Sequence, residues 1–291
     1  MKITNKYNLP EAICQAVKAW NYPPTANRYS VTELIAPPLI RKLKIQHWNE
    51  LEEDASDRLW VLLGQAVHSV LDKVKIEDAL QEEKLIAEFN GASISGRIDL
   101  YRYNSKSIED YKITSVWAFM LGDKPEWEAQ LNVYRWLYER YNFEVKQLKI
   151  NAILRDWKQS EALKNTDYPP IPFISVNIPL WTSNEVEEYI ASRLKKHEEG
   201  ASCTNEERWL RNEQWAVVKA GNKKALRLFD NIKDAESFIT EQEKNDKSLR
   251  LELQYRAGQY MRCESYCPVR TVCTEKKTNE ISDRETKGEK T

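Results

Sequence analysis

The sequence predicts an α/β protein in which helices flank a mixed central sheet, with a small β-β-α-β unit inserted towards the C-terminal end. Two patterns predict this fold. Between residues 56 and 157, apolar residues follow helical spacing, then strand alternation in three stretches, then helical spacing and strand alternation once more. After residue 202, a shorter stretch reads strand, strand, helix, strand over about 213–256. With 41% hydrophobic residues, the chain can bury a sizeable core.

These patterns divide the chain into three regions. Residues 1–202 form the main α/β core with its N-terminal helices, and residues 203–273 hold the small insert between cysteines. Residues 274–291 are a charged tail with almost no apolar side chains to bury. We therefore expect the tail to be disordered.

Short helices are expected ahead of the core. Residues 10–20 carry a proline in the first turn, where its missing N–H costs nothing. Ser30 and Glu33 have the spacing of a capping box, which predicts that a helix starts there. Pro37-Pro38 interrupts this helix, and helical spacing resumes over residues 39–48.

The best-marked helix spans residues 56–74. Ser56 or Asp57 can cap it. A stripe of apolar residues runs along one face: Leu59, Leu62, Leu63, Ala66, Val67, Val70 and Leu71. His68 follows Val67 in this helix. The helix alone favours a histidine satisfied by its neighbours, whereas the hairpin that follows favours a functional histidine.

Three antiparallel strands are expected after this helix. Residues 83–89 form the first, and Asn90-Gly91 supplies a turn into a strand over residues 92–103. Asn104-Ser105 then turns the chain into a return strand over residues 107–113.

Acidic residues fall on neighbouring strands of this hairpin. Asp99 lies on the first arm and Asp110 on the second, and Lys112 shares a face with Asp110 because side chains alternate along a strand. Two carboxylates and an ammonium suit a hard divalent cation and a polarised water. A solvated surface pair is the other interpretation of Asp110 with Lys112. Glu83 lies nearby in the sequence, but we assign it no role.

A further helix is expected over residues 125–141. Gln130 and Tyr134 lie one turn apart on it and point the same way, which fits a site as well as ordinary helix packing. The remaining elements expected in the core are two strands and a helix, over residues 145–157, 173–180 and 183–198.

Composition limits the function classes. The net charge of −1 excludes a global basic field, so a nucleic-acid site must be a local groove. Most of the ten Trp and fourteen Tyr are expected in the core, with stacking platforms for bases as the alternative. The sequence shows no signal peptide and no apolar run of membrane length, which predicts a cytoplasmic protein. There, clustered cysteines favour a metal site over disulfides.

Four short motifs resemble, in order and spacing, the PD-(D/E)XK nuclease superfamily, whose core is restriction-endonuclease-like. They are most similar to RecB-like exonucleases and the related CRISPR-associated and phage exonucleases. The motifs are Gly64-x-x-x-His68, Gly96-x-x-Asp99, Asp110-x-Lys112 and Gln130-x-x-x-Tyr134. With the cysteines, they cover most of positions 30–273.

The resemblance implies a catalytic role for several of these residues. His68, Asp99 and Asp110 would bind Mg²⁺ or Mn²⁺, together with the backbone carbonyl of Tyr111. Lys112 would orient or help to deprotonate the attacking water, and would stabilise negative charge at the phosphate.

Four cysteines bracket the small insert, with Cys203 before it and Cys263, Cys267 and Cys273 after it. A metal joining them would fix both ends of the insert by closing a long loop. Several RecB-like exonucleases carry a 4Fe–4S cluster held by one upstream cysteine and a C-terminal trio, and this chain resembles them. The resemblance therefore implies a structural Fe–S cluster.

The chain departs from that family pattern in two places. The first interval of the cysteine trio has one extra residue, and residues 34–43 lack the upstream cysteine that CRISPR-associated members usually carry. Cys203 or Cys14 must then be the fourth ligand. Zinc and unmetallated thiols are the alternatives to Fe–S. The simplest interpretation of Cys14 is a buried thiol in its helix.

The sequence therefore predicts a metal-dependent DNA exonuclease acting in recombination, repair or phage DNA processing, and the missing upstream cysteine favours a phage role over a CRISPR role. Gln130 and Tyr134 would line the DNA path or brace the site. Since the chain has no helicase motif, it would act on single strands or duplex ends, or with a helicase, annealing or recombination protein. The alternatives are a non-catalytic nucleic-acid-binding module and a restriction or repair endonuclease.

Overall fold

The computed structural model describes residues 1–19, 21–120 and 125–275. The chain forms two compact units, Met1–Ala201 and Ser202–Thr291. Both combine strands with helices, so the fold is mixed α/β, as predicted at that level. Residues 276–291 of the predicted tail lie outside the described residues. Among the helices that the structure describes, none has the length and apolar character needed to span a bilayer.

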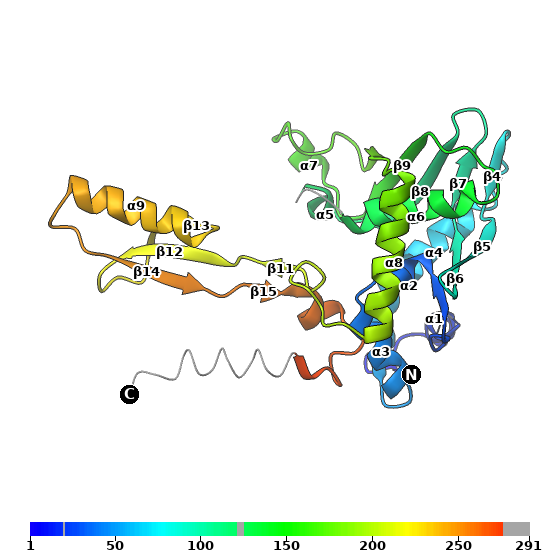
Figure 1. Ribbon diagram of the computed structural model, residues 1–291, viewed down its shortest axis with the longest axis horizontal. Coiled ribbons are helices and arrows are strands. Elements are labelled where there is room, and N and C mark those ends of the chain that lie inside the picture. Colours follow the sequence, from blue (N-terminus) through cyan, green and yellow to red (C-terminus); the bar gives the residue numbers. More distant parts are fainter. Residues whose placement is uncertain (20, 121–124, 276–291) are drawn as a thin grey trace. The chain divides into compact units, whose positions relative to one another are not determined.

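The strands of the first unit form two main sheets (Figure 1). They are β1 (Lys2–Thr4), β2 (Arg28–Ser30), β3 (Glu52–Asp54), β4 (Ala79–Gln81), β5 (Lys84–Phe89), β6 (Ala92–Arg97), β7 (Leu100–Arg102), β8 (Ser107–Thr114), β9 (Gln147–Leu154) and β10 (Phe173–Ile178). The larger sheet has the order β10-β9-β8-β7-β4, with β8 and β9 parallel and the other neighbours antiparallel. The smaller has the order β2-β6-β5, and β1 pairs with β3.

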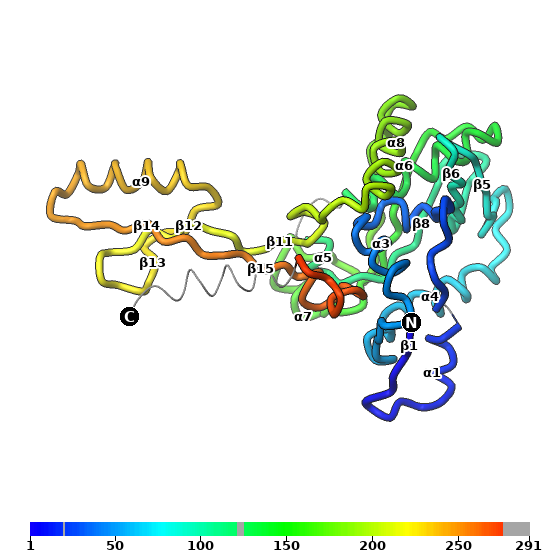
Figure 2. Tube along the Cα trace, turned by 60° about the horizontal axis from the view of Figure 1, so that its bottom comes forward, coloured from blue at the N-terminus to red at the C-terminus, as the bar shows by residue number. Residues whose placement is uncertain are grey.

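The first unit also contains helices. They are α1 (Glu11–Lys18), α2 (Val31–Ile35), α3 (Pro38–His47), α4 (Leu59–Leu71), α5 (Val116–Met120), α6 (Pro125–Glu139), α7 (Gln159–Ala162) and α8 (Ser183–Glu199). Helix α6 packs against strands of both sheets, and α8 packs against α6 (Figure 2). The apolar core therefore lies around α6, with Ile94, Ile108, Leu131 and Ile150 fully buried.

Local signals explain several boundaries and confirm the corresponding predictions. Ser30 and Glu33 form the expected capping box of α2, in which Ser30 Oγ accepts from Glu33 N at 3.2 Å. Pro38 opens α3, where its fixed φ suits the first turn. Asn90 and Gly91 have φ values of 48° and 77°, as a type I′ hairpin turn requires, and they join β5 to β6.

The prediction of a single strand over residues 92–103 is wrong. It is divided into β6 and β7, which belong to different sheets, so the predicted three-stranded sheet does not form. Between them, Ile98 is fully buried and the Asp99 carboxylate turns towards the backbone N–H of Tyr111, at 2.6 Å. Apolar alternation continues through this bend, and so the sequence pattern does not reveal it.

The helix predicted over residues 56–74 is shorter and more exposed than expected. A 3₁₀ turn, Ala55–Arg58, precedes α4, and Asp54 caps that turn, with Oδ1 accepting from Ser56 N at 3.0 Å. No residue of α4 is buried. Val70, on the predicted apolar stripe, is 62% exposed. The stripe therefore does not enter the main core, although Leu62 packs against the small cluster of Cys14, Val17 and Ala55.

The second unit contains the expected two strands, helix and strand. Its elements are β11 (Leu210–Arg211), β12 (Gln214–Lys219), β13 (Ala225–Phe229), α9 (Ile232–Asn245), β14 (Leu251–Arg256) and β15 (Gln259–Tyr260), followed by a helical turn, Arg262–Tyr266. Strand β12 lies between β13 and β14, antiparallel to both, and α9 packs on this sheet. Strands β11 and β15 pair where the chain enters and leaves it.

Candidate metal-binding and catalytic site

Two neighbouring strands of the larger sheet position the acids. Leu100 of β7 pairs with Glu109 of β8, so Asp99 and Asp110 occupy neighbouring positions at that end of the pair. Lys112 is two residues beyond Asp110 on the same face. Helix α4 packs against β8 and supplies His68 from another element. The structure thus brings together residues that are separated by more than forty positions in the sequence.

Asp99 is held through both of its carboxylate oxygens. Oδ2 accepts from the backbone N–H of Tyr111 at 2.6 Å, and Oδ1 lies 3.1 Å from Nδ1 of His68. The hydrogen bond to Asp99 raises the pKa of His68 above its ordinary value. The Tyr111 backbone and the His68 ring therefore fix the orientation of the Asp99 carboxylate.

Glu82, which sequence reasoning did not select, completes a group of three candidate ligand atoms. The ligand atoms of His68, Glu82 and Asp99 all lie within 4.8 Å of one another. Glu82 sits between β4 and β5 with a φ of 51°, and its backbone N–H donates to the Asp99 carbonyl at 3.3 Å. Burial and the charge of Asp99 raise the pKa of Glu82. Its left-handed backbone at a turn leaves no periodic signal.

Asp110 and Lys112 form a buried ion pair beside this group. Asp110 is only 4% exposed, and its Oδ2 lies 2.7 Å from Lys112 Nζ. Burial raises the pKa of Asp110, against the opposing charge of Lys112. Asp110, predicted as a metal ligand, is not in the group of residues whose ligand atoms all lie within 4.8 Å of one another. The backbone N–H of Tyr111 donates to Asp99, and metal binding by the Tyr111 carbonyl stays a prediction.

A chain of hydrogen bonds from α6 fixes the lysine. Lys112 Nζ donates to Gln130 Oε1 at 2.9 Å, and Gln130 Nε2 donates to the Tyr134 hydroxyl at 3.2 Å. The Tyr134 ring lies against Gly96, where an added Cβ would meet it at 2.8 Å. Glycine is therefore required at position 96 because the ring approaches the backbone so closely.

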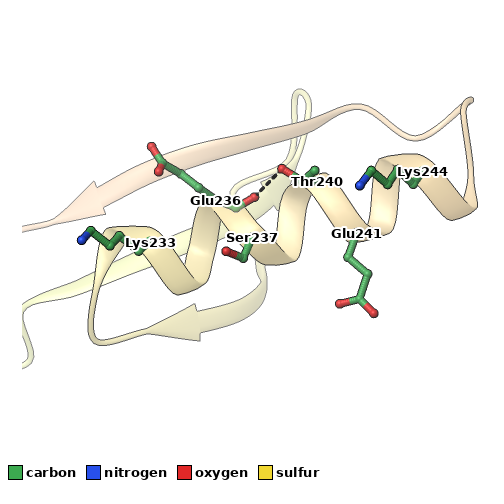
Figure 3. Close-up of a pocket in the computed structure, with 6 residues that line it drawn as sticks. All are labelled: Lys233, Glu236, Ser237, Thr240, Glu241 and Lys244. Atoms are coloured by element: carbon green, nitrogen blue, oxygen red, sulfur yellow. Dashed lines mark hydrogen bonds between the residues drawn. The ribbon is translucent and has the colours of Figure 1, made fainter.

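A hollow of about 70 Å³ adjoins the ligand atoms. Its lining residues are His68, Leu71, Asp72, Val74, Ile76, Gln81, Glu82, Asp99, Leu100 and Tyr111. A larger open hollow lies along α9 in the second unit, where all of the lining residues come from one helix (Figure 3). Those side chains, among them Lys233, Glu236 and Glu241, form no group of metal-ligand atoms within the described residues. The first hollow is therefore the better candidate for a site.

The cysteines divide between the two units. Cys203, Cys263, Cys267 and Cys273 belong to the second unit. Burial raises the pKa of Cys203 to about 12 and also raises that of Cys267, and the charges of neighbouring cysteines add to both effects. Among the described residues, no three of the sulfurs come within 4.8 Å of one another.

Cys14 belongs to the first unit. It lies in α1 and packs against Val17 of the same helix and against Ala55. Its Sγ donates to the Leu9 carbonyl at 3.7 Å. The second unit, by contrast, holds the other four cysteines, so Cys203 rather than Cys14 accompanies the C-terminal trio within one unit.

Two of the solved structures that are similar to this chain resemble it only weakly. No family model matches the chain, and no curated protein matches it. The crystal structure of SSO0001 is 21% identical, with a TM-score of 0.46 over 68% of this chain and 91% of that one. A phage-related exonuclease from Haemophilus somnus 129PT is 15% identical, with a TM-score of 0.30 over 65% of this chain and 78% of that one. At these levels, function has to be inferred from the residues of the site.

Proposed function

We propose that this chain is a metal-dependent deoxyribonuclease with a PD-(D/E)XK core, acting as an exonuclease. One observation carries the proposal: the ligand atoms of His68, Glu82 and Asp99 converge beside the buried pair of Asp110 and Lys112. A divalent ion next to a fixed ammonium suits phosphodiester hydrolysis, because negative charge develops on the phosphate in the transition state.

The residues present fit a divalent ion. An imidazole nitrogen and two carboxylates suit Mn²⁺, and Mg²⁺ accepts the same oxygens with water in its other positions. The charge of Asp99 raises the pKa of Glu82, so the two acids repel each other and a cation would relieve that repulsion. When bound, the ion would supply a Lewis acid and a water of lowered pKa. Asp110 adjoins this set as a further carboxylate.

Lys112 would act on the phosphate from a fixed position. Its ammonium is held between Asp110 and Gln130, at 2.7 and 2.9 Å. A positioned cation stabilises negative charge on a non-bridging phosphate oxygen as the water oxygen bonds to phosphorus and the ester P–O bond breaks. The departing oxygen ends as a hydroxyl, and the phosphate stays on the other product. Gln130 and Tyr134 would brace Lys112 rather than touch the reacting atoms.

We further propose that Cys203, Cys263, Cys267 and Cys273 hold a 4Fe–4S cluster that ties together the ends of the second unit. Around a single zinc ion, tetrahedral geometry with Zn–S bonds of about 2.3 Å requires sulfurs about 3.8 Å apart. Cys263 and Cys267 lie close enough to Cys203 for their charges to act on it, and Cys263 and Cys273 act on Cys267 in the same way, which supports a shared metal with zinc as the alternative to the cluster. Its role would be structural. Iron, sulfide and zinc analysis of protein purified without oxygen tests this proposal.

A digestion time course tests the nuclease proposal. End-labelled linear single strands, linear duplex and closed circular DNA are each incubated with Mg²⁺, Mn²⁺ or EDTA, beside Asp110→Ala. We expect metal-dependent loss of linear DNA only, and none with Asp110→Ala. Exposed Glu88 on β5 offers a matched acid, so Glu88→Gln should digest as the wild type does.

Other outcomes would contradict part or all of this proposal. Cleavage of the closed circle would mean an endonuclease. Equal digestion by Asp110→Ala and the wild type would refute the site. DNA binding that needs no metal and gives no product would indicate a non-catalytic module.

A further inference from the structure

An exposed tryptophan with a cation on its ring stands at the start of α4. The Trp60 side chain is 59% exposed, and the Arg155 guanidinium lies 4.2 Å from its ring centroid. More than half of the indole surface is therefore open to solvent, and its described ring contact is with the Arg155 guanidinium. Arg155 leaves much of its surface open, so another flat group could stack there.

Gly64 lies one turn further along the same helix. Glycine is a poor residue for a helix interior, and a neighbour that crowds the backbone usually explains it. Here an added Cβ would have nothing within 4 Å among the described residues. Neither the helix nor its packing requires glycine at this position. A molecule from outside that approaches the helix backbone would require it.

The same side of α4 leads to the candidate site. Trp60, Gly64 and His68 follow at four-residue intervals, so they lie on one side of the helix. With a rise of 1.5 Å per residue, Trp60 and His68 are about 12 Å apart along the axis. An open strip therefore runs from the tryptophan to the metal ligands.

Arg155 ties this strip to the catalytic strand. Its backbone N–H donates to the carbonyl of Thr114, the last residue of β8, at 2.9 Å. The carboxylate of the next residue, Asp156, accepts from the backbone N–H of Val116 at 2.7 Å. Trp117, which follows Val116, is 61% exposed. Arg155 and the exposed indole of Trp117 thus come from segments at the end of β8, the strand that carries Lys112, and Trp60 of α4 contacts the same Arg155.

We propose that Trp60, Gly64 and Arg155, called here the α4 strip, bind single-stranded nucleic acid and lead its backbone to the ligand group at His68. A base would stack on Trp60, the Arg155 charge would attract phosphate, and the strand would pass over Gly64. Bases in a duplex are hidden in the stack, so only a single strand offers a free base face. This inference rests on the proposed nuclease function and names its substrate class.

Binding without cleavage is the direct test. Fluorescence anisotropy with end-labelled single strands and blunt duplex, both in EDTA, compares the wild type with Trp60→Ala and Trp60→Phe. Losing a stacked base should weaken single-strand binding roughly 5- to 150-fold in Trp60→Ala. Trp60→Phe keeps a ring and should recover most of the affinity. Duplex binding should change little in either variant.

A matched control comes from the opposite end of the same strands. Tyr103 is 48% exposed and follows β7, whose Arg102 pairs with Ser107 at the start of β8. Tyr103→Ala should therefore bind single strands as the wild type does. Circular dichroism would verify that each variant is folded.

Gly64→Ala separates binding from helix stability. Alanine is the better helix former and meets no neighbour, so the melting temperature should rise. Single-strand affinity should nevertheless fall, because the methyl group projects into the strip. A helix without a ligand there would gain stability and keep its affinity, which would contradict the proposal.

The outcomes separate this inference from the proposed function. If the wild type digests DNA but Trp60→Ala binds single strands normally, the α4 strip is refuted and the nuclease stands. If the wild type neither binds nor cleaves any DNA, both are refuted. If Trp60→Ala instead converts a dimer to a monomer with unchanged DNA affinity, the strip is a self-association surface and the inference is wrong.

Discussion

The candidate catalytic site and the cysteine region differ in how much of their geometry the chain fixes by itself. At the catalytic site, protein groups already hold the polar side chains: Tyr111 N–H holds Asp99, and Gln130 holds Lys112. In the cysteine region, burial raises the pKa of Cys203 and Cys267, which keeps these thiols protonated. A metal must displace those protons before the sulfurs can become ligands.

This contrast indicates that the two proposed metals have different tasks. At the first site, protein groups hold Asp99 and Lys112 without an ion, and side chains positioned in advance in this way would suit the proposed catalysis. The second would be organised by its cluster, as a structural metal usually is. Replacing a side chain that holds Lys112 should therefore impair the first site. Removing the metal should impair the structure of the second unit.

The largest expected effect follows from Lys112→Met. Losing the fixed ammonium should lower the cleavage rate by about 10²- to 10³-fold, a loss typical of removing one group that stabilises transition-state charge. Stability should also fall, because Asp110 is left buried without its partner. Initial rates and urea denaturation measure the two effects.

The double variant Asp110→Asn with Lys112→Met sharpens this prediction. It removes the buried charge and should recover stability without recovering activity. A stable double variant that still cleaves DNA at the wild-type rate would show that the pair is only structural.

The next effect concerns the cysteine region. Cys267→Ser should abolish most bound iron and loosen the second unit, so amide hydrogen exchange should accelerate over β12 to β14 but not over β8 and β9. Mass spectrometry of exchanged peptides and metal analysis measure both. Cys14→Ser is the matched control, because Cys14 packs in the first unit. Equal iron in Cys267→Ser and the wild type would refute the ligand set.

A smaller effect tests how tightly Lys112, the proposed catalytic lysine, is held. In Gly96→Ala the new Cβ would lie 2.8 Å from the Tyr134 ring and 2.9 Å from Leu137, so one of them must move. Overpacking of this kind costs about 1–3 kcal/mol. Displacing Tyr134 also disturbs Gln130, so the cleavage rate should fall with stability.

The same substitution at Gly64 is the control for Gly96→Ala. No neighbour lies within 4 Å of that position, so Gly64→Ala should raise the melting temperature rather than lower it. Equal stability changes at the two glycines would refute the packing argument.

The sequence predicted most elements and the acids, because both have local signatures. Short alternating strands separated by Gly221-Asn222 identified the β-β-α-β pattern, and the two arms of the hairpin placed Asp99 beside Asp110. Glu82 was missed because its position depends on a left-handed turn between β4 and β5. The division between β6 and β7 was missed because burial of Ile98 continues the same alternation.

The exposure of α4 could not be predicted for a different reason. An apolar stripe at helical spacing indicates burial only if another element covers it, and that depends on the tertiary arrangement. Here Val70 and Trp60 remain exposed on the helix that carries His68. The contrast with α6, whose Leu131 and Leu137 are fully buried, shows that similar patterns can serve a core or a surface.

The smallest expected effect concerns the turn that starts α4. The Asp54 carboxylate accepts from Lys6 N at 2.8 Å, Ser56 N at 3.0 Å and Thr4 Oγ1 at 2.8 Å, and these bonds hold its pKa well below the usual range. A lowered folded pKa contributes stability above the unfolded value, about 4, and loses it as the pH falls towards the folded value. Asp54→Asn should therefore lower the melting temperature most at neutral pH, and the difference should shrink on acidification.

Melting curves of Asp54→Asn and the wild type between neutral and acidic pH measure this difference. Asp57→Asn removes an exposed acid from the same turn and controls for net charge. If the melting-temperature difference for Asp54→Asn stayed constant with pH, the effect would come from the shape of the side chain rather than from its charge. A difference that closes below about pH 4 would mean that the ionised Asp54 carboxylate stabilises the turn from which α4 begins.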